Sequence, residues 1–231
     1  MKKLLLVGLV WAALGIAGVA WAVPVELVVN GGFESGDLSG WDIHCNVTVQ
    51  NDTVFQGNYA AGLSISSEVT PSFFSFCTGD TDPFSAFLAQ ELEGFEFTNK
   101  IFTMSFAYNV DVLKNLSITG NDKLYAGYLA LNRDWNNVQI YGQYELVANG
   151  DTDGWQSYEK TIDLSGYDFD DLYIGFFFAD GCWLGSLDIS SAFLDNISVK
   201  ASPVPEPATM LLFGIGLCGL AFVGRKKLIR Q

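Results

Sequence analysis

Acidic side chains and a single histidine are the residues of this sequence that could carry catalysis. The acids within residues 168–171 and 151–153 offer the paired carboxylates that a polysaccharide hydrolase would use. Such carboxylates must face each other across the bond that is cut, about 5 to 9 Å apart, and no sequence feature places two acids in that way. The histidine, His44, stands beside Cys45 without the pattern of a nucleophilic triad. We therefore expect that the protein is not an enzyme, with a hydrolase as the less favoured alternative.

Four cysteines limit the metal and redox chemistry. Cys45, Cys77 and Cys182 lie in the body of the chain, and Cys218 lies in an apolar run near its end. Their spacing does not match a zinc-ligand pattern. In an oxidising compartment we expect one disulfide among the first three cysteines, which leaves one over, and the sequence alone does not assign the pairing. We favour Cys45 with Cys77.

Aromatic side chains offer a third kind of chemistry, because they stack on the apolar faces of sugar rings while nearby polar groups bind hydroxyls. Trp135, in the polar stretch Asn132–Asn137, and Trp183, beside Cys182, are the candidates for such a ligand site. For both, the alternative is a loop tryptophan that caps the edge of the core. Trp41 and Trp155 are better interpreted as core residues.

Short β-rich segments separated by Gly, Asn and Asp must position these residues, and no long stretch has helical periodicity. In Leu172–Phe178 the even-numbered residues predict one buried face, while Tyr173 and Phe177 make the other face apolar too, as in a central strand. The pattern predicts an all-β fold, a two-sheet jelly roll over residues 23–202. The expected strands are Val25–Val29, Tyr59–Ile65, Ile101–Val110, Leu124–Leu131, Val138–Val147, Gln156–Leu164, Leu172–Phe178 and Ala192–Lys200.

The N-terminal segment has the features of an export signal. Two lysines precede the apolar stretch Leu4–Val19, and Ala20–Ala22 follows it with a small-x-small cleavage pattern. We predict a signal peptide over residues 1–22, with an uncleaved membrane anchor as the alternative. Either interpretation places the following domain outside the cytoplasm.

The C-terminal segment predicts a transmembrane helix. The run from residue 208 to residue 224 has no charged side chain, and at about 1.5 Å rise per residue it reaches roughly 25 Å, close to the thickness of the hydrocarbon core. Basic residues in the segment 225–231 place the end of the chain in the cytoplasm. The alternative, a buried core helix, is disfavoured because the run is apolar on every face.

The same tail resembles a PEP-CTERM sorting signal over residues 203–231. The resemblance implies recognition and cleavage by an exosortase, a membrane-embedded protease of Gram-negative bacteria that make extracellular polysaccharide. It also implies an exported chain that is transiently anchored in the inner membrane through its C-terminal helix and then reaches the cell surface or the medium. The matching residues are Val204, Pro205, Glu206, Pro207, Ala208, Thr209, Arg225, Lys226 and Lys227.

The two ends of the predicted domain carry a second resemblance. The segments Asn30–Gly36 and Gly40–Trp41, and the closing segment Phe193–Val199, are similar to the opening and the end of carbohydrate-binding-module jelly rolls. In several such modules the opening glutamate and the closing aspartate help to hold a structural calcium ion.

By position, the resemblance assigns a structural calcium site to Glu34 and Asp195. Asn30 and Asp37 are weaker candidate ligands because they are close to Glu34 in the sequence. The strand parity that Asp195 shares with Phe193 and Ile197 predicts an inward carboxylate, which needs a partner because burying an unpaired charge is costly. Calcium would supply that partner. Backbone N–H groups or a serine would serve equally well.

The charge of the chain restricts its partners further. The net charge is −14, but the segment from Val23 to Val204 holds 25 of the 26 acids and six of the 12 basic residues, a net charge near −19. Such a surface repels nucleic acid and favours cations and neutral partners. We therefore expect an exported, non-catalytic protein that associates with extracellular polysaccharide. The alternative is a purely structural matrix or adhesion protein without a sugar site.

Overall fold

The computed structural model describes residues 24–66, 85–93, 100–112, 122–133, 139–179 and 189–201, and the strands lie in one compact unit, Val25–Ser202. Within the described part of the chain no helix is long and apolar enough to cross a membrane. The predicted signal peptide and transmembrane helix fall outside these ranges. The strands are β1 (Val25–Glu26), β2 (Asp42–Cys45), β3 (Val47–Gln50), β4 (Ala60–Ser66), β5 (Ser85–Glu91), β6 (Ile101–Val112), β7 (Lys123–Asn132), β8 (Gln139–Asn149), β9 (Gln156–Asp163), β10 (Asp171–Ala179) and β11 (Ile189–Ala201).

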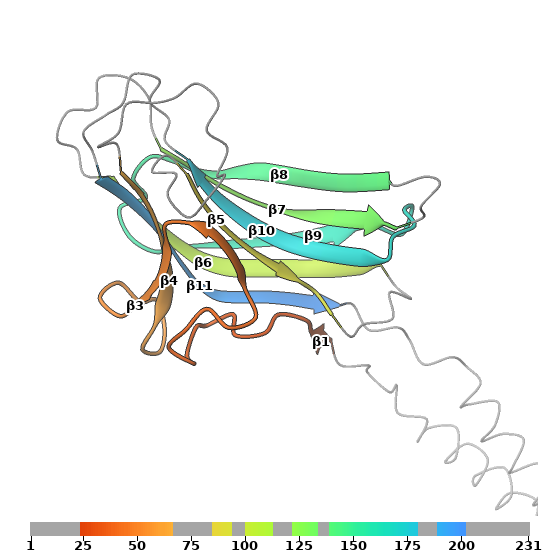
Figure 1. Cartoon of the computed structure of the whole chain (residues 1–231), viewed down its shortest axis with the longest axis horizontal. Coiled ribbons are helices and arrows are strands. Elements are labelled where there is room, and N and C mark those ends of the chain that lie inside the picture. The colour runs from red at the N-terminus through yellow and green to blue at the C-terminus, as the bar shows by residue number, and fades with distance from the viewer. Residues whose placement is uncertain are drawn as a thin grey trace, which may run out of the picture. The chain divides into compact units, whose positions relative to one another are not determined.

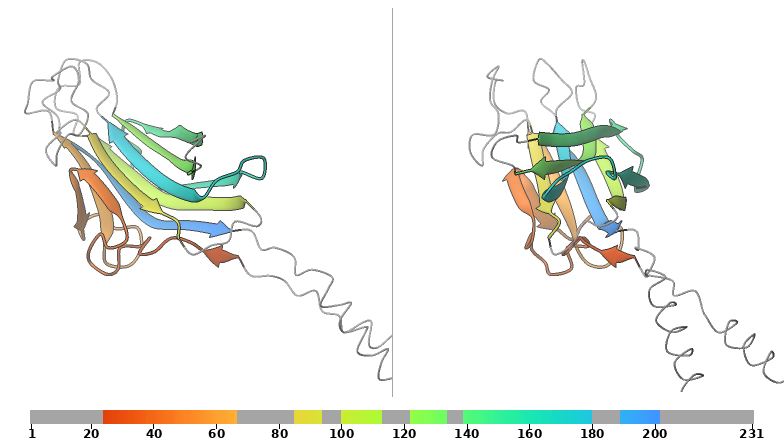
Figure 2. Two further views of the ribbon diagram at one scale, coloured as in Figure 1. Left: turned by 45° about the vertical axis from the view of Figure 1, so that its right-hand side comes forward. Right: turned by 90° about the vertical axis from the view of Figure 1, so that its right-hand side faces the viewer.

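The strands form two antiparallel sheets that pack as a sandwich (Figures 1 and 2). Sheet A has the order β3-β4-β11-β6-β9, with β1 also paired to β11, and sheet B has the order β2-β5-β10-β7-β8. From β4 onward the chain alternates between the sheets except at β7 and β8, which are consecutive neighbours in sheet B. As a result β4-β11-β6-β9 faces β5-β10-β7-β8, which is the two-Greek-key arrangement of a jelly roll. The predicted all-β sandwich is confirmed.

The core lies between the inner faces of the two sheets. On β10 the even-numbered side chains Leu172, Ile174, Phe176 and Phe178 are buried, and β10 is the middle strand of sheet B, as its parity predicted. The ring of Phe176 meets Phe106 of sheet A edge-on, with a centroid distance of 4.9 Å. Each fully buried side chain of this size contributes about 1.5 to 3 kcal/mol, and together they hold the sheets at a fixed separation.

A β-bulge in β11 corrects the predicted parity of its closing segment. The register with β6 shifts between Asp195 and Ser198, and Asn196 has a φ of 50°. Because the bulge adds one residue, Leu194 and Ile197 both face the core, whereas Phe193 and Asp195 lie on the outer face of sheet A. Phe193 is therefore only half-buried, and the prediction that Asp195 points into the core with Phe193 and Ile197 was wrong, because the bulge separates Ile197 from the other two.

Candidate functional site

The outer face of sheet B, which points away from the core, carries a row of aromatic side chains. The strand register places His44 opposite Phe87, Phe87 opposite Phe177, and Phe177 opposite Tyr125. These residues have the parity opposite to the buried set, so their rings stand on the outer face. The row therefore crosses β2, β5, β10 and β7 at right angles to the strands.

A row of small residues runs beside the aromatic row. Ala89, Gly175 and Gly127 are paired across β5, β10 and β7, and Gly127 is paired in turn with Tyr144 of β8. A Cβ atom on Gly175 would lie 2.5 Å from the hydroxyl oxygen of Tyr144. The glycines thus leave the space in which the ring of Tyr144 lies across the sheet from its edge strand.

A groove of about 500 Å³ lies along the aromatic row and is lined by Phe87, Lys123, Tyr125, Tyr144, Phe177 and Ala179. This volume falls in the range of about 300 to 1,000 Å³ that is typical of small-ligand sites. Tyr144 is 42% exposed, so one face of its ring is available for stacking. Burial raises the pKa of Tyr144, which keeps its hydroxyl a neutral donor.

Polar side chains lie on the same outer face, beyond the row of small residues. The hydroxyl of Tyr173 donates to Glu91 Oε2 over 2.9 Å, and burial, followed by this hydrogen bond, raises the pKa of Tyr173. The guanidinium of Arg133 is paired with Asp171 and lies 3.7 Å from Glu91 Oε1. This polar cluster presents donors and acceptors of the kind that bind sugar hydroxyls.

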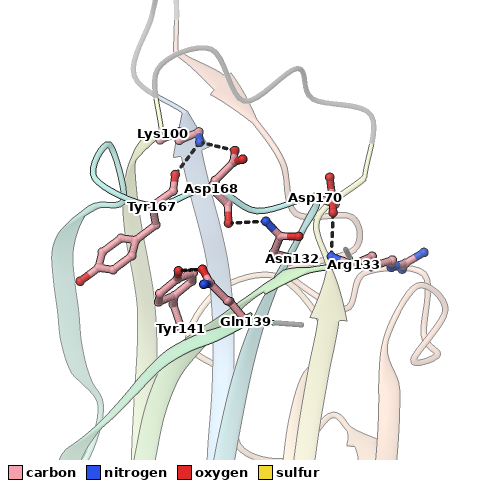
Figure 3. A network of polar contacts seen from close by, with 8 residues as sticks. All are labelled: Lys100, Asn132, Arg133, Gln139, Tyr141, Tyr167, Asp168 and Asp170. Carbon is pink, nitrogen blue, oxygen red and sulfur yellow. Dashed lines mark hydrogen bonds and ion pairs between the residues drawn. The ribbon is translucent and has the colours of Figure 1, made fainter. Parts of the chain in front are cut away.

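Four of the acids that suggested a hydrolase hold loops, whereas Asp171 belongs to the polar cluster and pairs with Arg133. Lys100 Nζ donates to the Tyr167 carbonyl oxygen and lies 3.3 Å from Asp168 Oδ1, while the backbone N–H of Arg133 donates to Asp170 over 2.7 Å (Figure 3). In the other group, the N–H of Asp153 donates to Asp151 Oδ1. These contacts fix the turn that leads into β10 and the one that leads into β9, and none of these acids lines the groove.

Several of the sequence candidates fall outside the described residues. They are Trp135, Trp183, Cys77, Cys182 and the whole sorting motif. Cys45 is disulfide-bonded, and both candidate partners are among the residues not described. His44 is exposed and lies 6.0 Å from Phe87 between ring centroids, at the end of the aromatic row.

A second polar site holds the loop 51–59 over the outer face of sheet A. Asp195 is fully buried, and it accepts hydrogen bonds from the backbone N–H groups of Phe55, Gln56 and Asn196 at 3.1, 3.0 and 2.7 Å. Glu34 holds the other end of the same loop. We call Asp195 and Glu34 the loop anchors.

Glu34 receives the N–H groups of Asn58 and Tyr59 at 2.8 and 3.1 Å and the side-chain amide of Asn58 at 3.0 Å. Gly57, at a φ of 82°, lies so close that an added Cβ would be 2.2 Å from Glu34 Oε1. These donors lower the pKa of Glu34, led by the N–H of Asn58. The pKa of Asp195 is instead raised, chiefly by burial and further by the charge of Glu34.

The loop anchors supply carboxylate oxygens, the type of ligand that calcium accepts. A carboxylate has about four lone-pair positions, and each anchor uses three of them for the N–H donors described above. A Cβ atom on Gly32 would lie 3.7 Å from Asn196 Oδ1 and 3.9 Å from Asp195 Oδ1, so both side-chain oxygens lie near this glycine. The Asn30 side chain instead donates to the carbonyl oxygens of Asp37 and Ser39. Among the described residues no cluster of three or more acidic, His or Cys side chains is arranged around a metal position.

The tail matches a known sorting motif, and the sandwich unit has a known type of fold. The model of the PEP-CTERM protein-sorting motif matches residues 203–227, so the chain carries this motif, which implies export, sorting to the cell surface and processing by an exosortase. Its sandwich unit has carbohydrate-binding modules as structural neighbours. No curated protein matches the chain.

Three of these neighbours differ widely in sequence from the chain. The CBM22-1 xylan-binding domain from Paenibacillus barcinonensis Xyn10C is 11% identical, with 80% of this chain and 99% of that one covered at a TM-score of 0.51. The tandem CBM22-1-CBM22-2 domain of the same protein is 13% identical, with 81% of this chain and 48% of that one covered at a TM-score of 0.50. TmCBM61, solved in complex with beta-1,4-galactotriose, is 16% identical, with 76% of this chain and 97% of that one covered at a TM-score of 0.47. At such identities the likeness concerns the fold.

Sequence reasoning missed the residues that line the groove. The predicted ligand site used tryptophans in polar stretches, and it did not include Tyr125, Tyr144 or Phe87. A signal was present in the apolar odd-numbered residues of β10, since Phe177 could not belong to the buried face. That signal marked the correct face of one strand, but only the register shows which neighbours complete the site.

Proposed function

We propose that this chain is a non-catalytic protein of the cell surface or extracellular matrix that binds extracellular polysaccharide through the groove on sheet B. The observation that carries the proposal is the combination of the aromatic row with Tyr144 lying across the row of small residues. The rings offer flat apolar faces to sugar rings, and Lys123 and the cluster around Tyr173 offer hydrogen bonds to hydroxyls. The acidic domain disfavours anionic polymers, so the ligand is a neutral or weakly charged polysaccharide.

A binding screen tests this function. The Val25–Ser202 unit, which contains the whole core, is applied to immobilised neutral polysaccharides and to the extracellular polysaccharide of the producing cells. We expect retention on at least one of them, and we expect Trp135→Ala and Trp183→Ala to have smaller effects than substitutions in the groove. Failure to bind any of them would leave a purely structural matrix or adhesion protein. Turnover of a bound polysaccharide, lost on carboxylate substitution, would overturn the non-catalytic assignment.

We further propose that the tail anchors the chain transiently in the inner membrane until an exosortase cuts near Pro205-Glu206-Pro207. Prolines on both sides of Glu206 keep the segment extended and remove backbone donors, which leaves it accessible to a protease. Intact mass spectrometry should detect a chain that lacks Met1–Ala22 and the residues after about Pro207. Glu206→Ala should abolish release, whereas Glu93→Ala should not. Release of Glu206→Ala at the normal rate would contradict the assignment.

We propose a structural calcium ion at the loop anchors, where the ion would offset the mutual repulsion of Glu34 and Asp195 and hold the loop 51–59 on sheet A. At a calcium concentration a hundredfold above Kd the expected stabilisation is about 2.7 kcal/mol. For a unit of this size that corresponds to a rise of roughly 5 to 10 °C in Tm. Calorimetry in CaCl₂ and in EDTA measures it, and Glu34→Gln should remove most of the difference. Equal Tm values in the two buffers would show that the N–H donors alone satisfy the anchors.

A further inference from the structure

The edge strand β8 has an exposed apolar face. Among the described strands it pairs with β7 alone, and it forms the upper edge of sheet B in Figure 1. Ile140, Tyr144 and Leu146 have the same parity and are 63%, 42% and 49% exposed. A long edge strand with few charges is a template on which another strand can pair.

The other described edges are protected in ways that β8 is not. β2 and β3 have four residues each, and β9 carries Glu159, Lys160 and Asp163 along its eight residues. Short length and charge are the usual means by which proteins prevent edge pairing. β8 has eleven residues and one charged side chain, Glu145. That charge is compensated by Lys160 and by the hydroxyl of Tyr158, and these two contacts lower the pKa of Glu145.

The sequence of β8 is complementary to itself when two copies run antiparallel about Gln143. This register places Ile140 opposite Leu146 of the second copy, two apolar side chains on the outer face. It places Gly142 opposite Tyr144, and because the Tyr144 ring is directed over its own sheet toward Gly175, no bulky side chain obstructs this pair. On the other face it places Tyr141, whose hydroxyl donates to Gln139, opposite Glu145, whose charge is compensated within its own domain. The bulge at Val147, where the register with β7 shifts, ends the matched stretch.

We infer that β8 pairs with β8 of a second copy of this chain, so that the two five-stranded sheets join into one ten-stranded sheet with a twofold axis at Gln143. The uncharged face of β8 explains how two acidic domains can meet, since the copies join where neither presents an uncompensated charge. Pairing of a sheet edge with an identical edge gives a closed, isologous dimer.

The dimer extends the proposed binding site. A twofold axis perpendicular to the sheet keeps both outer faces on the same side, so the two grooves lie next to each other with one Tyr144 on each side of the axis. This consequence rests on the proposed polysaccharide binding, whereas the interface does not. A polymer that spans both grooves would bind more tightly than a short oligosaccharide, because the second contact is intramolecular.

Sedimentation velocity of the Val25–Ser202 unit over a range of concentrations tests the interface. We expect a monomer–dimer equilibrium, and we expect Ile140→Lys to raise the dimer dissociation constant at least tenfold, because it places two charges on the apolar face. Val29→Lys is the matched control, since Val29 is 64% exposed and lies outside β8. A monomer at all concentrations, or a dimer that Ile140→Lys leaves intact, would overturn the inference.

Cross-linking tests the register without disturbing the interface. In the twofold arrangement residue 143 faces itself at about 4.5 to 5.5 Å between Cα atoms, which is within disulfide range. Gln143→Cys should therefore form a covalent dimer under mild oxidation, and Gln139→Cys, whose twofold mate is Val147, should not. Equal cross-linking of the two variants would exclude this pairing.

The two proposals fail in different ways. If the unit dimerises through β8 but is retained by no polysaccharide, the proposed interface stands and the proposed binding function is refuted. If the unit binds polysaccharide but is monomeric and gives no Gln143→Cys cross-link, the proposed binding function stands and the proposed interface is refuted.

Discussion

Tyr144→Ala should weaken polysaccharide binding by about thirtyfold while the fold stays intact. Truncating an aromatic side chain at the centre of a binding site costs about 2 kcal/mol, which is roughly a thirtyfold increase in Kd. Tyr144 has this position because its ring lies across the row of small residues and its hydroxyl approaches Gly175. Isothermal titration with the polysaccharide found in the screen measures the change, and an unaltered Tm checks the fold.

Two further variants separate stacking from other effects of Tyr144. Tyr144→Phe retains the ring and should keep most of the affinity. Tyr167→Ala is the matched control, because Tyr167 is 43% exposed, packs on Tyr141 with a centroid distance of 4.4 Å and does not line the groove. Because burial raises the pKa of Tyr144, its hydroxyl should stay protonated and its contribution should be constant from neutral pH to about pH 10. Equal losses for Tyr144→Ala and Tyr167→Ala would place the site elsewhere.

Asp195→Ala should destabilise the Val25–Ser202 unit by about 3 kcal/mol, because buried donors lose a charged acceptor that nothing replaces. The three N–H groups that it receives belong to Phe55, Gln56 and Asn196, so the loop 51–59 loses its attachment to sheet A. A fall of roughly 6 to 12 °C in Tm follows for a unit of this size. Asp195→Asn retains one acceptor oxygen and should lose less. Glu159→Ala, an exposed acid on β9, should change little, and a fall as large as that of Asp195→Ala would refute the role of Asp195.

The stability linked to Asp195 should also depend on pH in calcium-free buffer. Burial and the charge of Glu34 raise its pKa in the folded state, so just above the ordinary value of 3.8 the folded chain binds more protons than the unfolded chain. Stability from this group therefore falls as pH rises from 3.8 through the raised pKa. Asp195→Asn should lack this slope in urea titrations at successive pH values. A contribution from Asp195 that rises with pH in this window would show that its folded pKa is lowered.

The sequence predicted most of the long strands but not all of the sheets. In β10 both faces are apolar, which locates a central strand without further information. β3 is only four residues long, and neither β2 nor β5 has a comparable alternation. The pairing of β2 with β5 joins segments more than 40 residues apart in the chain. Strand propensity is too weak to identify such segments, because packing against neighbours determines it.

The candidate site was less accessible to prediction than the fold. Tyr144 reaches the groove only because β8 pairs with β7 in a register that sets it opposite Gly127, and a shift of one residue would turn it to the other face. Asp195 was correctly expected to need partners, but its direction depends on a bulge. Asn196 can adopt the positive φ that this bulge requires, but the residue does not predict the bulge, because asparagine adopts positive φ at many turns.

The place of β11 in sheet A affects how the unit bears mechanical load. β11 lies between β4 and β6, and its last residue, Ala201, leads directly into the sorting tail. With the tail anchored as proposed, a pull on the domain would run along β11, perpendicular to the hydrogen bonds that join it to both neighbours. Those bonds are sheared together instead of opening one at a time, so the strand nearest the tether is also the one that resists extraction best.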